Sequence, residues 1–104
     1  MYARNVTMNL KPNSGREFTR TLETEIVPIL REQGGFADEL TFLDPTGTQA
    51  VAISLWDDKA SADAYSRDGY PRVLKGLSKV VEGTPVVVTY DVSSSTFHKI
   101  PAHN

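Results

Sequence analysis

Apolar and polar side chains alternate along residues 2–10, which is the pattern of a β-strand with two different faces. Ser14 and Glu17 then have the spacing of a capping box, so we expect a helix to begin here. Pro28 removes one backbone hydrogen bond and predicts a kink, and the glycine pair at 34–35 predicts the helix end. The apolar face of this helix is formed by Phe18, Leu22, Ile26, Ile29, Leu30 and the apolar stem of Gln33.

Residues 36–43 and 49–56 both have the composition of strands. Between them, residues 44–47 read Asp-Pro-Thr-Gly, with proline and glycine placed as a tight reversal requires. We therefore expect these two strands to form an antiparallel hairpin.

A change of composition after the hairpin predicts two helices. Asp57 and Asp58 offer a cap and negative charge at the start of a helix over residues 59–67, and the Asp-Gly pair at 68–69 interrupts it. A second helix is expected to end before Gly83. Its predicted buried stripe is Tyr70, Val73, Leu74, Leu77, Val80 and Val81.

Residues 85–92 form the fourth predicted strand, and its three valines at 86–88 are apolar on both faces, which indicates a sheet covered on both sides. The order strand, helix, strand, strand, helix, strand predicts an α+β, ferredoxin-like fold with split βαβ units and a four-stranded antiparallel sheet. We expect residues 1–93 to form this domain and residues 94–104 a C-terminal tail.

Two helices on one face of such a sheet leave its other face open. Alternation assigns many apolar strand residues to that face, and a patch of this size is rarely exposed on a monomer. We therefore expect a homodimer that associates through the sheet. The apolar strand residues considered for this patch are Val6, Met8, Val51, Ile53, Leu55, Val86, Val88 and Tyr90.

Composition and charge narrow the function classes. The 104 residues are 39% hydrophobic and 23% charged, which is typical of one ordinary globular domain and not of a disordered chain. A net charge of -2 argues against nucleic acid as a partner. The chain has no cysteine and no long apolar run, so we expect no disulfide, no membrane span and a cytoplasmic location.

Several short segments keep a recognisable order and spacing: Met1-Tyr2-Ala3-Arg4, Ile26-Val27-Pro28-Ile29-Leu30, Gly34-Gly35-Phe36, Leu43-Asp44-Pro45-Thr46-Gly47, and Ser54-Leu55-Trp56-Asp57 with Ala60, Ala64 and Tyr65. Together they resemble the antibiotic biosynthesis monooxygenase (ABM) domain superfamily of dimeric α/β barrels. The resemblance covers nearly the whole chain. It implies a homodimer, a cleft between sheet and helices, and a small apolar or aromatic ligand. The superfamily includes cofactor-independent quinone-forming monooxygenases, haem-degrading monooxygenases and proteins of unassigned role, so the fold does not settle the activity.

We expect the cleft to be lined by small and polar strand residues, which leave volume unfilled. The residues considered for this lining are Ala3, Asn5 and Thr7 on the first strand and Ala50, Ala52, Ser54 and Trp56 on the third. Alternation alone does not show which strand face looks toward the helices.

Oxidation without cofactor or metal needs an electron-rich substrate and a protein that orients it and steadies a developing oxyanion. Asn5 and Trp56 are the candidate catalytic residues: Asn5 could hold a keto or enolate oxygen, and Trp56 could cover a flat ring or donate its indole N–H. Tyr65, Tyr70 and Ser54 are the candidate substrate-binding residues. Each also has a structural interpretation, with Trp56 as a core anchor, Asn5 as a satisfied sheet residue and the tyrosines as packing residues.

Other chemistry has less support. Arg4 could steer an anionic ligand, but we expect it to pair with Asp91 or Glu39. The haem-degrading members of this superfamily use an axial histidine on a helix after the tryptophan position. The two histidines of this chain, His98 and His103, lie in the tail. A tyrosine would therefore have to bind the haem iron.

The leading hypothesis is a monooxygenase that oxidises an electron-rich aromatic or quinol-like molecule with dioxygen. The alternative is a non-catalytic dimer that binds a small hydrophobic metabolite. Within the tail, residues 96–100 alternate enough to form a short extra strand that reaches the partner subunit, and we expect residues 101–104 to be disordered.

Overall fold

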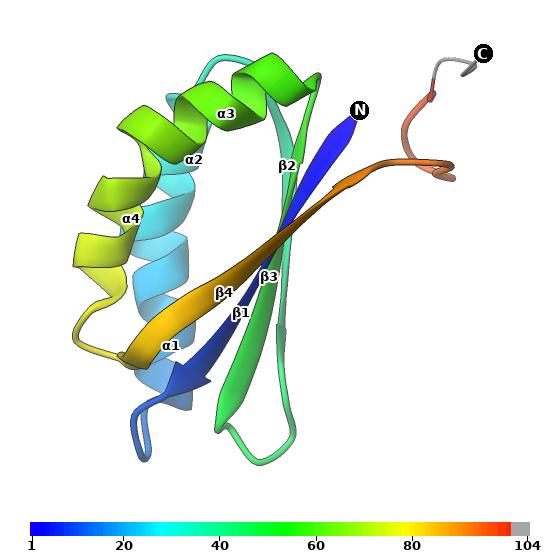
Figure 1. The fold of residues 1–104 in the computed structure, drawn as a ribbon. Helices are drawn as coiled ribbons and strands as arrows, with labels where there is room; N and C mark the ends of the chain where they lie inside the picture. Colours follow the sequence, from blue (N-terminus) through cyan, green and yellow to red (C-terminus); the bar gives the residue numbers. More distant parts are fainter. Residues whose placement is uncertain (101–104) are drawn as a thin grey trace.

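The computed structural model describes residues 1–100 of the chain, and all its helices lie on the same side of one sheet (Figure 1). The four strands are antiparallel, in the order β2-β3-β1-β4. This confirms the predicted α+β, ferredoxin-like fold. The elements are β1 (Tyr2–Leu10), α1 (Gly15–Thr21), the π-helical segment η1 (Leu22–Ile26), α2 (Val27–Arg31), β2 (Phe36–Leu43), β3 (Gln49–Trp56), α3 (Lys59–Asp68), α4 (Tyr70–Leu77) and β4 (Val81–Asp91).

The first three strands have the predicted bounds, but β4 begins earlier than expected. Val81 and Gly83 belong to this strand, whereas the sequence placed Val81 in the preceding helix. The pairing between β1 and β4 shifts between Thr7 and Asn9, and Gly83 has a φ of 69° near this irregularity. A glycine in the left-handed region allows a strand to continue through a bulge, so it does not end a helix here.

The first helix departs from a regular α-helix at two points. The predicted capping box is wrong, because no side chain caps α1 and the Ser14 hydroxyl donates instead to the Pro12 carbonyl at 3.4 Å. Further along, the Val27 N–H donates to the Leu22 carbonyl, five residues back, which forms the π-helical turn η1. The interruption predicted at Pro28 therefore takes the form of a wider turn just before the residue that has no N–H to donate.

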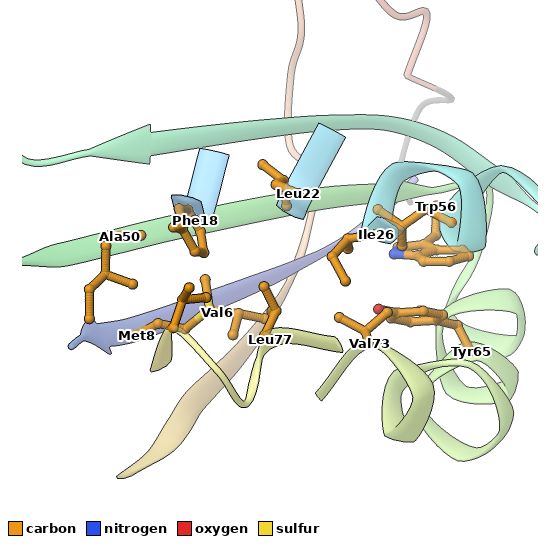
Figure 2. Packing of buried hydrophobic residues seen from close by; sticks show 14 residues of the cluster. Val6, Met8, Phe18, Leu22, Ile26, Ala50, Trp56, Tyr65, Val73 and Leu77 are labelled. Atoms are coloured by element: carbon orange, nitrogen blue, oxygen red, sulfur yellow. The ribbon is translucent and has the colours of Figure 1, made fainter. Parts of the chain in front are cut away.

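The core lies between the helices and one face of the sheet (Figure 2). In the register, Val6 is opposite Ala52 and Met8 is opposite Ala50, so these residues share the helix-covered face. The prediction that included Val6 and Met8 among the open-face candidates is wrong for these two, which are buried under the helices. The largest fully buried side chains are Trp56, Phe18, Met8 and Val80.

The open face of the sheet is apolar, as predicted. It carries Leu40, Val88 and Tyr90, with exposed fractions of 54%, 42% and 53% in the single chain. Asn5 lies on β1, between β3 and β4, and is opposite Ile53 on β3 and Val88 on β4. The homodimer that would cover this face stays a prediction.

After β4 the chain leaves the sheet on the side away from the helices (Figure 1). Residues 96–98 form a bend in the single chain, and the His98 imidazole contacts the Asp38 carboxylate of β2. The extra strand stays a prediction, since its pairing partner would be a second subunit. The expected disorder of residues 101–104 and the histidine at 103 lie outside the described residues. In the described part of the chain, no helix is long and apolar enough to cross a membrane.

Candidate functional site

An aromatic cluster closes one end of the core. The Trp56 ring stacks on Tyr65 with centroids 4.7 Å apart and meets the edge of Phe36 at 5.5 Å. Tyr65 is followed by Tyr70, whose ring centroid lies 6.0 Å away. Figure 2 shows the Tyr65 hydroxyl pointing back along the core toward Val73. Three rings from β3, α3 and α4 thus form one continuous wall.

Local backbone features bring these rings together. The Asp58 carboxylate accepts a hydrogen bond from the Ser61 N–H at 2.8 Å, which confirms the predicted cap and starts α3 directly after Trp56. Gly69 then separates α3 from α4, as predicted. A Cβ at position 69 would come within 2.7 Å of the Tyr65 ring, so glycine allows Tyr65 and Tyr70 to pack on neighbouring helices.

A cavity of about 40 Å³ lies between the sheet and the helices, beside this aromatic wall. It is small, since pockets that enclose drug-sized ligands measure roughly 300–1,000 Å³. Its apolar lining includes Val6, Met8, Leu22, Ile26, Leu30, Ala52, Val73 and Leu77, and its polar lining is Arg4, Glu39, Ser54, Tyr65 and Tyr70.

Arg4 is the unexpected member of this lining. Its side chain is only 3% exposed, and its guanidinium carbon lies 4.9 Å from the Tyr65 ring centroid and 4.4 Å from that of Tyr70. The buried Nε has no hydrogen-bond partner among residues 1–100. The predicted pairing with Asp91 or Glu39 is wrong, because no carboxylate in the described chain lies within 4.0 Å of this guanidinium.

The two tyrosines of the cavity are hydrogen-bond donors at neutral pH. Burial raises the pKa of the Tyr65 hydroxyl to about 12, and the opposing effect of the nearby Arg4 charge is smaller. Burial also raises the pKa of Tyr70, again against the Arg4 charge. Both phenols therefore stay protonated and can donate to a ligand oxygen, but neither serves as a base.

The structure brings four of the five predicted site residues together. Ser54, Tyr65 and Tyr70 line the cavity, and Trp56 borders it through its stacking on Tyr65. The indole N–H of Trp56 is engaged, because it donates to the Ser54 hydroxyl at 2.9 Å. Trp56 therefore packs against Tyr65 as a fully buried ring, and its N–H is not free to meet a ligand.

Asn5 lies on the opposite face of the sheet from Trp56. In the register Ser54 is opposite Arg4, whereas Asn5 is opposite Ile53 on the open face. The prediction that the Asn5 set and the Ser54 set line one cleft is wrong, because alternating residues of paired strands face opposite ways. The Asn5 Oδ1 is buried and has no hydrogen-bond partner in the described chain. A catalytic role for Asn5 stays a prediction and would have to operate on the open face.

The open face holds a second, larger hollow. A groove of about 900 Å³ lies between the sheet and the tail, and Leu40, Ile53, Leu55 and Phe97 supply its apolar lining. The tail forms its far wall, and the Phe97 side chain is 70% exposed in the single chain. This groove belongs to the surface that the predicted dimer would cover.

No model of a known protein family matches the chain, and no curated protein matches it. Solved structures do. A monooxygenase from the gene ActVA-Orf6 of Streptomyces coelicolor, in complex with nanaomycin D, has a TM-score of 0.75 and 17% identity, over 94% of this chain and 92% of that one. SnoaB, a cofactor-independent oxygenase from Streptomyces nogalater, has a TM-score of 0.74 and 12% identity, over 93% and 97%.

A further structure, of an antibiotic biosynthesis monooxygenase, has a TM-score of 0.70 and 19% identity, over 90% of this chain and all of that one. The chain shares the α+β, ferredoxin-like fold of these structures. The resemblance inferred from its sequence landmarks is confirmed at this level. Because the identities are low, the similarity establishes the fold, and the activity has to be argued from the site.

Proposed function

We propose that the protein is a small monooxygenase that oxidises an electron-rich aromatic or quinol-like molecule with dioxygen and needs no metal or organic cofactor. The observation that carries this proposal is the cavity between sheet and helices, with its apolar walls, its aromatic end and its few polar groups. Two proteins of the same fold are described as a monooxygenase and a cofactor-independent oxygenase, which supports the proposal.

For an anthrone the proposed reaction converts a ring CH₂ to C=O, and for a hydroquinone it converts a ring C–H to C–OH as the ring becomes a quinone. In both cases one oxygen atom of O₂ enters the product and the other leaves as water. The substrate itself supplies the electrons once it has lost a proton. The protein has to exclude water, orient the ring and stabilise negative charge on the substrate oxygen. The Tyr65 and Tyr70 hydroxyls would donate to the oxygen, and Trp56 would hold the Tyr65 ring in place through the stacking between them.

The size of the cavity favours small substrates. A volume of about 40 Å³ does not hold a three-ring anthrone unless side chains on α4 move away from the sheet. A single-ring hydroquinone, which with O₂ would give the hydroxyquinone and water, needs much less rearrangement. We therefore expect single-ring compounds to react faster than three-ring compounds.

The proposal includes a homodimer that associates through the open sheet face. Leu40, Phe42, Val86, Val88 and Tyr90 all expose 42–61% of their surface there in the single chain. Burial of several hundred Å² of such surface favours association, at roughly 25 cal/mol per Å² before the costs of docking.

Steady-state oxygen uptake with a panel of hydroquinones and anthrones tests the function. We expect uptake by the native protein and a clear reduction in Trp56→Phe, which keeps an aromatic ring but shortens the wall. Asn5→Ala reports on the open face: uptake that depends on Asn5 would move the reaction to that face. No uptake with any compound would favour the non-catalytic, ligand-binding alternative.

A haem titration addresses the remaining alternative. Haem is far larger than the cavity. We therefore expect no shift of the Soret band on mixing, and a saturable shift that is lost in Tyr65→Phe would instead support haem binding.

A further inference from the structure

A buried positive charge without a negative partner is costly, and Arg4 is such a charge. Moving an ionised group out of water costs several kcal/mol unless an opposite charge or hydrogen bonds compensate. Arg4 has an exposed fraction of only 3%, and its Nε has no hydrogen-bond acceptor in the described chain. The fold maintains this arrangement next to a cavity.

The groups around Arg4 compensate for the charge only in part. Ser54 of β3 and Thr89 of β4 are its neighbours in the sheet, and both are uncharged. From the helices, the faces of Tyr65 and Tyr70 attract the guanidinium through their ring electrons. Glu39 is the one carboxylate among the cavity residues, and it lies more than 4.0 Å away, where its own oxygen accepts from the Thr41 hydroxyl.

We propose that the cavity binds its ligand as an anion, with the charged oxygen of a single aromatic ring placed on the Arg4 guanidinium. The ligand class is an aromatic carboxylate or an ionised phenol, since both present an anionic oxygen attached to a flat ring. This inference rests on the proposed function for the location of the site, and it adds the charge and the size of the substrate.

The rest of the site fits an anionic oxygen. The guanidinium offers donors in a planar fork, and the protonated Tyr65 and Tyr70 hydroxyls add donors from the helix side. The apolar walls would hold the ring. Bound in this form, a phenol has already lost the proton whose removal makes it electron-rich, so the same contact selects the reactive ionisation state.

Paired probes test the proposal without turnover. Benzoate and its neutral analogue benzamide form one pair, and para-nitrophenolate and its neutral analogue para-nitroanisole form the other. Binding is measured by calorimetry and by the fluorescence of Trp56, the only tryptophan, which stacks on Tyr65 beside Arg4. We expect at least one anion to bind about 10- to 100-fold more tightly than its neutral analogue, the range for hydrogen bonds to a charged group.

Variants locate the effect. Arg4→Met keeps a long side chain without the charge and should lose the preference for the anion, whereas Arg4→Lys should retain part of it. Arg16→Met removes an exposed charge from α1 and should bind as the native protein does. Tighter binding of benzoate than of benzamide would identify a carboxylate as the ligand group. Tighter binding of para-nitrophenolate than of para-nitroanisole would identify an ionised phenol.

The inference is overturned if neither anion binds, if the neutral analogues bind equally well, or if Arg4→Met binds the anion like the native protein. Should Arg4→Met fail to fold, as judged by circular dichroism, the comparison of charged and neutral probes on the native protein still decides. Anion binding without oxygen uptake would refute the proposed function alone. Oxygen uptake that is unchanged in Arg4→Met would refute the inference alone.

Discussion

The two faces of the sheet are built from alternate residues of the same strands, yet a single chain covers only one of them with helices. On the helix-covered face, Met8 is 2% exposed and Trp56 is fully buried. On the open face, Val86 is 61% exposed and Tyr90 is 53% exposed. The covered face therefore stabilises the single chain, and the open face is apolar surface that the single chain leaves in contact with water.

Each face also carries one polar exception. This exception is a buried side-chain atom that has no hydrogen-bond partner in residues 1–100: the Arg4 Nε on the covered face and the Oδ1 of Asn5, the next residue, on the open face. Buried polar atoms usually have hydrogen-bond partners, so the exceptions point to partners outside the single chain. The covered face would obtain its partner from a ligand, and the open face from a second subunit.

Removal of the aromatic anchor should have the largest effect on the free energy of unfolding. Trp56→Ala deletes a fully buried ring that packs on both Phe36 and Tyr65. We expect destabilisation by about 3–5 kcal/mol in urea unfolding. Phe97→Ala removes an aromatic ring that is 70% exposed and should change little. Equal effects of the two substitutions would contradict the contrast between the faces.

Removal of the buried charge should act in the opposite direction. Arg4→Met replaces an unpaired guanidinium with an apolar chain of similar length, so we expect the free energy of unfolding to rise by about 1–4 kcal/mol. Thermal and urea unfolding without ligand measure this change. A loss of stability would mean that the contacts of Arg4 with the tyrosine rings outweigh the cost of its burial.

A charge on the open face should affect association more than folding. Val88→Lys places an ammonium in the middle of the exposed patch, and we expect a dimer measured by analytical ultracentrifugation to dissociate. The free energy of unfolding of the single chain should change by no more than about 0.5 kcal/mol. Thr24→Lys, at an exposed position of η1 on the helix side of the sheet, is the control. A native protein that is a monomer at all concentrations would refute the dimer.

The smallest expected effect lies in the turn that joins β2 to β3 at the edge of both faces. Hydrogen bonds from Thr46, from the Gln49 N–H and from Thr48 lower the pKa of Asp44 from 3.8 to about 2. A lowered pKa stabilises the fold above pH 3.8, and this contribution is lost as the pH falls through 2.

The native protein should therefore be more stable than Asp44→Asn near neutral pH, and the difference should shrink as the pH is lowered toward 2. Thermal unfolding across this range measures it. A difference that is independent of pH would mean that the amide replaces the carboxylate in the turn.

Local sequence patterns predicted the bounds of a strand correctly when those bounds did not depend on its pairing with another strand. Alternation set the bounds of β1, and the turn at residues 44–47 set those of the hairpin strands. The start of β4 depends on an irregular pairing with β1, at Thr7 and Asn9, which no local pattern reveals. At Ser14 a local pattern was misleading. The sequence has the spacing of a capping box, but the Ser14 hydroxyl donates to the Pro12 carbonyl instead.

The candidate site was likewise predictable only where local sequence patterns were sufficient. Trp56, Tyr65 and Tyr70 were predicted from the sequence, and the fold brings them into one aromatic cluster, of which Tyr65 and Tyr70 line the cavity. The choice between Arg4 and Asn5 depended on which of two alternating sets faces the helices, and that is decided by tertiary packing. A signal was present, since Arg4 alternates with Val6 and Met8, the apolar residues of the buried set.

The π-helical turn explains a regularity in the first helix. Phe18, Leu22, Ile26 and Leu30 are all buried, at a constant spacing of four residues. In an α-helix of 3.6 residues per turn, this spacing rotates each successive side chain by about 40°, or roughly 120° over the whole series. The wider turn at Leu22–Ile26 slows the rotation and keeps the four side chains in one line over the sheet. Deletion of one exposed residue from this turn would leave spacings of four, three and four residues, which a regular α-helix places within about 60° of one another. The same four side chains would then still face the sheet, so the helix should tolerate loss of the residue that the wider turn accommodates.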